Sequence, residues 1–66
     1  MRFAALLKSL REARGWSIGR LSAETGISTN SLWQYETGRR QPKWKNTQRL
    51  AKALGVPSIE LLEAME

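Results

Sequence analysis

The stretch TGISTNSLWQYETGRRQP, residues 25–42, decides how this chain folds. The first of its two glycines, Gly26, stands between two short segments that each begin with a serine, Ser17 and Ser28. Serine is a preferred helix N-cap because its hydroxyl accepts a hydrogen bond from a first-turn N–H group. Gly26 allows the positive φ that a tight turn needs, and Ile27 can fill the angle between the two helices. The stretch therefore predicts two short helices that meet at a sharp turn.

The second of these helices, between Ser28 and Gly38, is predicted to have a polar outer face. Leu32 and Tyr35 are three residues apart and face the same way as Ile27, which is the spacing of a helix side turned to a core. The opposite side then presents Thr29, Asn30, Trp33 and Gln34. This arrangement is the helix-turn-helix pattern, whose second helix can lie in the major groove of DNA. A solvated helix face without a ligand is the simpler alternative.

The side chains on this outer face have the chemistry of base recognition. The amide of Asn30 or Gln34 can bond two atoms of one adenine edge, and the methyl group of Thr29 can contact that of a thymine. Trp33 has three possible roles. It can cover sugar–phosphate surface, contact thymine methyl groups, or fold over Tyr35.

Helical periodicity continues through the rest of the chain, and no alternating run indicates a strand. A first helix ends at Gly15, and its inner positions are Phe3, Leu6, Leu7, Leu10 and Ala13. A fourth ends at Gly55, and its inner stripe is Trp44, Thr47, Leu50, Ala51 and Leu54. A fifth follows Pro57, and one of its faces has Ile59, Leu62 and Met65. We expect an all-α, compact bundle of five helices in a single domain, residues 1–66, with Trp16 and Trp44 in the core.

The composition limits the chemistry that this chain can perform. It has 66 residues and contains neither Cys nor His. Disulfides and thiolate metal sites are excluded, together with the commonest general base and the commonest zinc ligand. We see no paired carboxylates or glycine-rich phosphate loop, so we expect no enzymatic activity, no cofactor and no metal. No run approaches the roughly 20 apolar residues of a membrane span. We therefore expect a cytoplasmic, nucleoid-associated protein.

The positive charge is concentrated in one part of the sequence. Eleven Lys and Arg against six Asp and Glu give a formal charge of +5. No acidic residue occurs between Glu36 and Glu60, and that interval contains Arg39, Arg40, Lys43, Lys45, Arg49 and Lys52. A one-sided cationic block attracts polyanions, either nucleic acid or an acidic membrane surface. Solubility alone is the other explanation.

At these residues the sequence resembles the Cro/repressor-like, or XRE-type, helix-turn-helix domains, which are lambda-repressor-like bundles. The resemblance covers nearly the whole chain, through LREARGWS, LSAETGISTNSLWQYETGRRQP, LAKALGV and ELL. It implies that Thr29, Asn30 and Gln34 meet base edges. It also implies a structural pair between Arg11 in the first helix and Glu36 just before the glycine turn.

The same resemblance implies where the DNA backbone is held. Arg39, Arg40 and Lys43 stand where the family grips phosphates, and the start of the fourth helix, near Asn46, offers free amides to the same strand. Ser28 and Ser31 suit phosphate contacts by their own chemistry.

The second helix departs from the family pattern. Ile18 stands where the family often has a phosphate-binding Gln, and Gly19 stands where a helix former is usual. The residues left to contact phosphate at this end are Ser17 and Arg20.

These features predict a sequence-specific regulator of transcription, expected to be a repressor, that binds double-stranded DNA. One such helix reads only a few base pairs, so a homodimer is expected, with Ile59, Leu62 and Met65 as its seam. The simpler alternative is that these three residues cap the core. The alternative is the antitoxin of a toxin–antitoxin pair, in which Trp33 and the C-terminal apolar face would hold the toxin partner.

Overall fold

Two of the helices begin at capping serines. The computed structural model describes residues 2–66, which form α1 (Arg2–Ala13), α2 (Ile18–Thr25), α3 (Thr29–Glu36), α4 (Trp44–Leu54) and α5 (Ser58–Ala64). The Ser17 hydroxyl accepts the backbone N–H of Arg20, and the Ser28 hydroxyl accepts that of Ser31. Both serines are therefore N-caps, as their positions predicted. The prediction of five helices without a strand is confirmed over residues 2–66.

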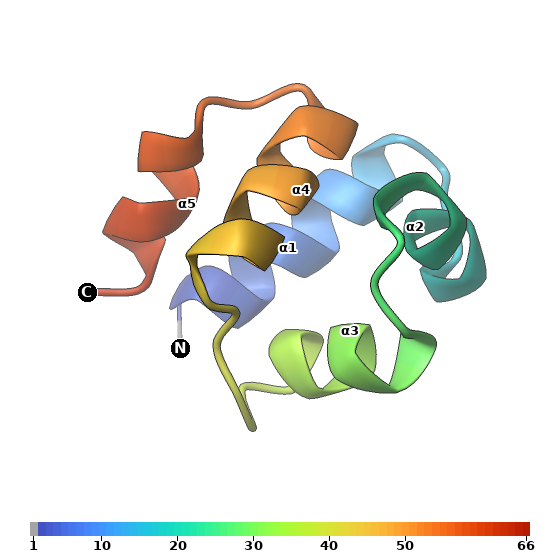
Figure 1. The fold of residues 1–66 in the computed structure, drawn as a ribbon, viewed down its shortest axis with the longest axis horizontal. Helices are drawn as coiled ribbons and strands as arrows, with labels where there is room; N and C mark the ends of the chain where they lie inside the picture. Colours follow the sequence, from blue (N-terminus) through green and yellow to red (C-terminus); the bar gives the residue numbers. More distant parts are fainter. Residues whose placement is uncertain (1) are drawn as a thin grey trace.

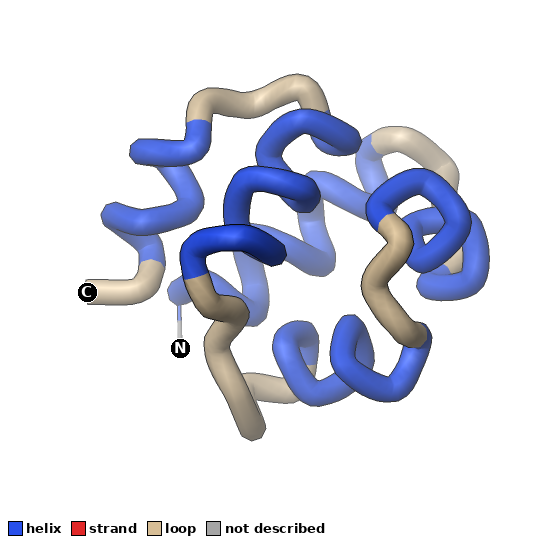
Figure 2. Tube along the Cα trace, in the orientation of Figure 1, coloured by secondary structure: helices blue, strands red, loops and turns tan. Residues whose placement is uncertain are grey.

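The helices are arranged around α4 and α1. In Figure 1, α5 and α2 lie on opposite sides of α4, and both pack against it. α3 lies below them and packs against α1 and α2. Figure 2 shows that α2 and α3 are joined by a short loop, whereas an extended segment leads from α3 up to α4. This segment brings the cationic residues after Gly38 to the same side of the molecule as α3.

One hydrophobic core joins all five helices. Its largest fully buried apolar side chains are Phe3, Leu7, Leu21, Leu32, Leu50 and Leu61. Ile27 from the turn is buried in the same cluster, and Trp16 packs against it while half-buried. Full burial of one Leu or Phe side chain is worth about 1.5–3 kcal/mol. Leu32 therefore anchors α3, whose eight residues are too few to form a stable helix alone.

Two of the predicted inner positions are wrong. Trp44 is 53% exposed, although the other four residues of the predicted α4 stripe are buried. Side chains tilt toward the N-terminus of their helix, so the first residue of α4 projects past the end of the core. Ala13 is also exposed. The buried stripe of α1 is centred on Phe3 and Leu7, and Ala13 lies off its edge.

The face predicted for α5 makes only part of the contact with the core. Leu61 and Ala64 are buried there, Met65 packs against the same cluster, and the sequence did not identify Leu61. Ile59 is 58% exposed, while Leu62 and Met65 are half-buried. None of the helices within residues 2–66 is long and apolar enough to cross a lipid bilayer.

Candidate nucleic-acid interface

The turn between α2 and α3 is held by its own hydrogen bonds. Gly26 has a φ of 74°, and its N–H donates to the Ser22 carbonyl at 2.8 Å. The Ser22 hydroxyl donates to the Ile27 carbonyl at 2.6 Å. The Ile27 N–H donates to the Thr25 hydroxyl oxygen at 3.2 Å. With the Ile27 side chain buried as well, the turn holds α3 at a fixed angle to α2.

The outer face of α3 is largely exposed. Thr29, Asn30 and Trp33 are exposed, Gln34 is half-buried, and Leu32 and Tyr35 on the opposite face are buried. Thr37, the C-cap of α3, is exposed next to Trp33, and its hydroxyl donates to the Trp33 carbonyl at 2.9 Å. The sequence reading missed Thr37, although its spacing of four residues from Trp33 places it on the same side.

The three tryptophans differ in their surroundings, and Trp33 does not fold over Tyr35. Its ring is stacked against Arg39, whose guanidinium carbon lies 5.0 Å from the ring centroid. The Tyr35 ring is covered instead by Arg40, at 5.5 Å. Trp16, at the start of α2, lies 5.1 and 5.0 Å from the guanidinium carbons of two other arginines, Arg14 and Arg20.

An ion pair fixes α3 to α1. The Arg11 Nε donates to Glu36 Oε2 at 2.7 Å and its Nη2 donates to Oε1 at 2.9 Å. The Arg11 Nη1 also donates to the Trp16 carbonyl at 2.7 Å. The side chains of Arg11 and Glu36 are only 11% and 5% exposed. The hydrogen bond to Glu36 raises the pKa of Arg11 above its ordinary value, against the lowering effect of burial. The expected structural pair is thus present as a bidentate salt bridge.

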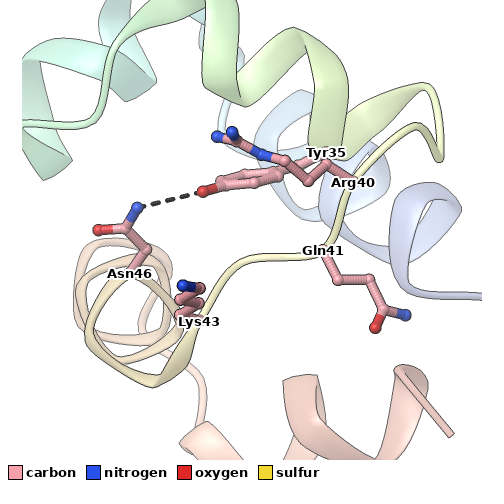
Figure 3. Close-up of a pocket in the computed structure, with 5 residues that line it drawn as sticks. All are labelled: Tyr35, Arg40, Gln41, Lys43 and Asn46. Carbon is pink, nitrogen blue, oxygen red and sulfur yellow. Dashed lines mark hydrogen bonds between the residues drawn. The ribbon is translucent and has the colours of Figure 1, made fainter.

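A polar cavity of about 260 Å³ lies where α3, the following segment and α4 meet. It is lined by Tyr35, Arg40, Gln41, Lys43 and Asn46 (Figure 3). The Asn46 Nδ2 donates to the Tyr35 hydroxyl at 3.1 Å, which ties the first turn of α4 to α3. Figure 3 shows the Arg40 side chain lying along the Tyr35 ring, while Gln41 points toward the C-terminal part of the chain. Gln41 there donates to the Met65 carbonyl at 3.3 Å.

The residues expected to contact phosphate differ in how far they are already engaged. The Arg40 Nη2 donates to the Ser31 hydroxyl at 3.0 Å, and that hydroxyl also accepts from Ser28 at 3.0 Å. Lys43 is exposed and is the N-cap of α4, but makes no side-chain capping bond. The N-cap side chain therefore accepts no hydrogen bond from the first-turn N–H groups of α4. Unpaired N–H groups at a helix N-terminus commonly bind an anion.

The sequence placed Tyr35 on the inner face of its helix and Arg49 in the cationic block, but assigned neither residue to this site. The Tyr35 hydroxyl lines the cavity although its ring is buried, as the polar tip of a tyrosine can. Arg49 follows Asn46 by three residues, one helical turn later, and its Nη1 donates to the Asn46 Oδ1 at 3.5 Å.

The start of α2 is built differently from the start of α4. Ile18 is half-buried and packs against the core. Arg20 forms an exposed ion pair with Glu24 at 2.8 Å, an i,i+4 contact within α2. A Cβ atom at Gly19 would meet only the Ser17 hydroxyl, at 3.6 Å. Packing thus accounts for Ile18, and nothing in the surroundings requires glycine at position 19.

Within residues 2–66 no group of three or more His, Cys, Asp or Glu side chains could hold a metal ion. The outer face of α3 is thus exposed beside a cationic segment, and the helix is held by contacts to α1, α2 and α4.

Comparisons with known proteins agree with one another. A family model described as a helix-turn-helix domain matches residues 2–65. An uncharacterised HTH-type transcriptional regulator of Mycobacterium tuberculosis is 42% identical over 53 residues, which are 80% of this chain and 21% of that protein. The cryptic phage CTXphi transcriptional repressor RstR of Vibrio cholerae is 31% identical over 64 residues, 97% of this chain and 58% of the repressor. The chain therefore spans about a fifth of the length of the mycobacterial relative and more than half of the phage repressor.

A solved structure shares the fold. The restriction-modification controller protein C.AhdI from Aeromonas hydrophila superposes with a TM-score of 0.85 at 32% sequence identity, over 91% of each chain.

Proposed function

The chain belongs to the helix-turn-helix domain family, and on this premise we propose that it is a sequence-specific regulator of transcription that binds double-stranded DNA. The observation that carries the proposal is the exposed polar face of α3, mounted beside a cationic segment. A helix of this kind fits the B-DNA major groove, which is about 12 Å wide. Relatives named as transcriptional regulators and a phage repressor support the same role, and repression is the expected direction.

Base contacts are assigned to the outer face of α3. Asn30 and Gln34 each carry an amide that can donate to N7 and accept from the N6 amino group of one adenine in a two-bond pairing. Thr29, at the start of the helix, can contact a base edge or a thymine methyl group. Trp33 is the fourth side chain on this face and is assigned to the same groove.

Phosphate contacts are assigned to the rim of this face. Arg39, Arg40 and Lys43 supply the charge, and the cavity beside Asn46 and the α4 N-terminus is large enough for a phosphate group. The hydroxyls of Ser17, Ser28 and Ser31 are engaged within the protein, so we assign them weaker contacts. These groups give affinity and orientation without selecting a sequence.

The proposal is tested by selecting bound sites from random duplex DNA and measuring binding against salt concentration. We expect an enriched site with two-fold symmetry, half-sites about 34 Å apart, and affinity that falls steeply as salt rises. Failure to enrich any sequence, together with no binding to duplex at low salt, would contradict the proposal.

Lys43→Ala tests the assignment of phosphate contacts. Its removal should lower affinity for all sequences alike and reduce the slope of log K against log salt by about one unit. Lys52→Ala makes the same charge change near the other end of α4 and is the matched control, with little change in slope expected. Loss of base preference in Lys43→Ala would show that Lys43 reads sequence instead.

We also propose a homodimer, because symmetric pairing of two such domains doubles the number of base pairs read. α5 offers the contact surface, since Ile59 is exposed and Leu62 and Met65 lie half-buried beside it. None of the relatives named above is called an antitoxin, so no observation favours a toxin partner.

The proposed activity is binding alone, because helix-turn-helix regulators are not typically enzymes. We also propose that the protein is cytoplasmic and associated with the nucleoid.

A further inference from the structure

The outer face of α3 contains one large apolar side chain among polar ones. Trp33 is 44% exposed and lies one helical turn after Thr29 and one turn before Thr37. Leu32 and Tyr35 already fill the inner side of α3, so Trp33 is not needed to hold the helix on the core. In the proposed complex its ring enters the major groove between the side chains assigned to bases.

The end of α3 fixes the position of this ring. Gly38 has a φ of 77°, its N–H donates to the Tyr35 carbonyl at 3.4 Å, and the Arg39 N–H donates to the Gln34 carbonyl at 2.9 Å. These two bonds form a Schellman motif, which turns the chain back over the last turn of the helix. Arg39 is thereby brought to 5.0 Å from the centre of the Trp33 ring. A guanidinium is attracted to the face of an indole ring, so this contact favours one orientation of the ring before any ligand arrives.

The major groove of DNA offers few partners to an indole ring. Base edges there present hydrogen-bond donors and acceptors, and the apolar group among them is the C5-methyl of thymine. 5-Methylcytosine presents the same methyl group at the same ring position.

We infer that Trp33 reads the C5-methyl group of one pyrimidine in each half-site, and that Arg39 is the positioning residue that orients its ring. The inference rests on the proposed function and adds a chemical feature to the operator. The chain distinguishes a methylated from an unmethylated pyrimidine edge at one position. Arg39 contributes to this discrimination through Trp33, in addition to its charge.

The test replaces each thymine of the selected half-site by deoxyuridine, one at a time. Uracil keeps every hydrogen-bonding group of thymine and lacks only the methyl. At one position we expect affinity to fall about fourfold, the factor for one buried methyl group. In Trp33→Ala the same substitution should have no effect at that position. Trp33 is exposed, so this variant is expected to fold, which its circular dichroism and thermal unfolding would verify.

Gln34→Ala serves as the matched control on the same helix. It should bind more weakly but retain the deoxyuridine penalty at the Trp33 position. Arg39→Gln should reduce that penalty, because the ring loses the guanidinium that orients it. Lys43→Ala removes a nearby charge without touching the ring and should leave the penalty unchanged.

Cytosine and 5-methylcytosine at the same position separate the two sources of the methyl group. If both methylated pyrimidines are read, 5-methylcytosine should bind more tightly than cytosine in the wild-type protein and equally in Trp33→Ala. An advantage for thymine over uracil without one for 5-methylcytosine would restrict the site to thymine.

Three outcomes overturn the inference. No thymine position shows a deoxyuridine penalty, or the penalty persists in Trp33→Ala, or Trp33→Ala binds its site as the wild type does. The last result would leave Trp33 as a contact for another protein. Selective, salt-dependent binding under any of these outcomes leaves the proposed function intact, whereas absence of duplex binding overturns both.

Discussion

At the scale of single residues, the side chain of Arg11 on α1 fixes the position of α3 through its bonds to Glu36. Arg11 donates three hydrogen bonds of 2.7–2.9 Å. Two go to the Glu36 carboxylate on α3, and one goes to the Trp16 carbonyl just before α2. The pKa of Arg11 is raised by Glu36, so the stabilisation from this pair is present below the alkaline range in which free arginine loses its proton. The position of α3 thus depends on a contact outside its outer face.

Glu36→Gln should destabilise the fold by about 3 kcal/mol, because it leaves the Arg11 guanidinium in a largely buried site without its counter-charge. Urea unfolding at 25 °C measures the change. Glu24→Gln, which breaks the exposed pair with Arg20, is the control and should cost under about 1 kcal/mol. Equal losses in the two variants would show that burial of the Arg11–Glu36 pair is unimportant.

Gln34→Ala should cost about 1–3 kcal/mol of binding free energy and relax the preference at one base step. The reason is that a two-bond contact to adenine is lost while the phosphate contacts remain. Titration against the selected site and its single-base variants measures both effects. Unchanged affinity and selectivity would remove Gln34 from the base-reading face.

At the scale of elements, the need for glycine depends on whether the residue lies inside a helix or at its end. The two glycines of α2 differ in this way. Gly19 is an ordinary helical position with room for a Cβ atom, whereas Gly26 has a φ of 74° and forms the C-cap of the helix. An alanine at position 26 would have to adopt a left-handed conformation that costs roughly 1–2 kcal/mol.

Gly19→Ala should therefore stabilise the fold by about 0.5–1 kcal/mol, and Gly26→Ala should destabilise it by at least 1 kcal/mol. The pair differs only in backbone conformation, since neither site has a neighbour that blocks a methyl group. Thermal unfolding followed by circular dichroism distinguishes them. A destabilised Gly19→Ala would reveal a requirement for glycine in α2 beyond its geometry.

At the scale of the whole molecule, the cations after Glu36 and the exposed Ile59 of α5 lie on different elements, whereas the exposed Trp33 and Trp44 lie among the cations. The cations after Glu36 follow α3 and continue along α4, while α5 has the acidic residues Glu60 and Glu63 beside exposed Ile59. A protein of this charge distribution can bind a polyanion with one side and leave α5 open to a second copy.

Ile59→Asp tests this division. Charged groups facing each other across a two-fold contact repel, so the variant should be monomeric at concentrations where the wild type is a dimer. Sedimentation equilibrium measures the mass, and binding to a single half-site should be unchanged. A wild-type protein that stays monomeric at high concentration and on its operator would overturn the dimer proposal.

Features that depend on neighbouring residues were predictable without coordinates. Serine caps, glycine stops and the spacing of apolar residues act over a few positions, so they predicted five helices, and the spacing of Leu32 and Tyr35 predicted the outward side of α3. The chemistry of Thr29, Asn30 and Gln34 likewise predicted a base-reading surface, which remains a proposal.

Only the tertiary structure decided which groups meet across the chain. Trp44 was predicted inside and lies outside, because periodicity does not say where the core ends. The contact of Asn46 with the Tyr35 hydroxyl depends on how α4 is placed against α3, and the stacking of Arg39 on Trp33 depends on how the chain turns after Gly38. These contacts join groups whose distance is set by packing and by backbone direction, and neither is contained in the local pattern of apolar and polar residues.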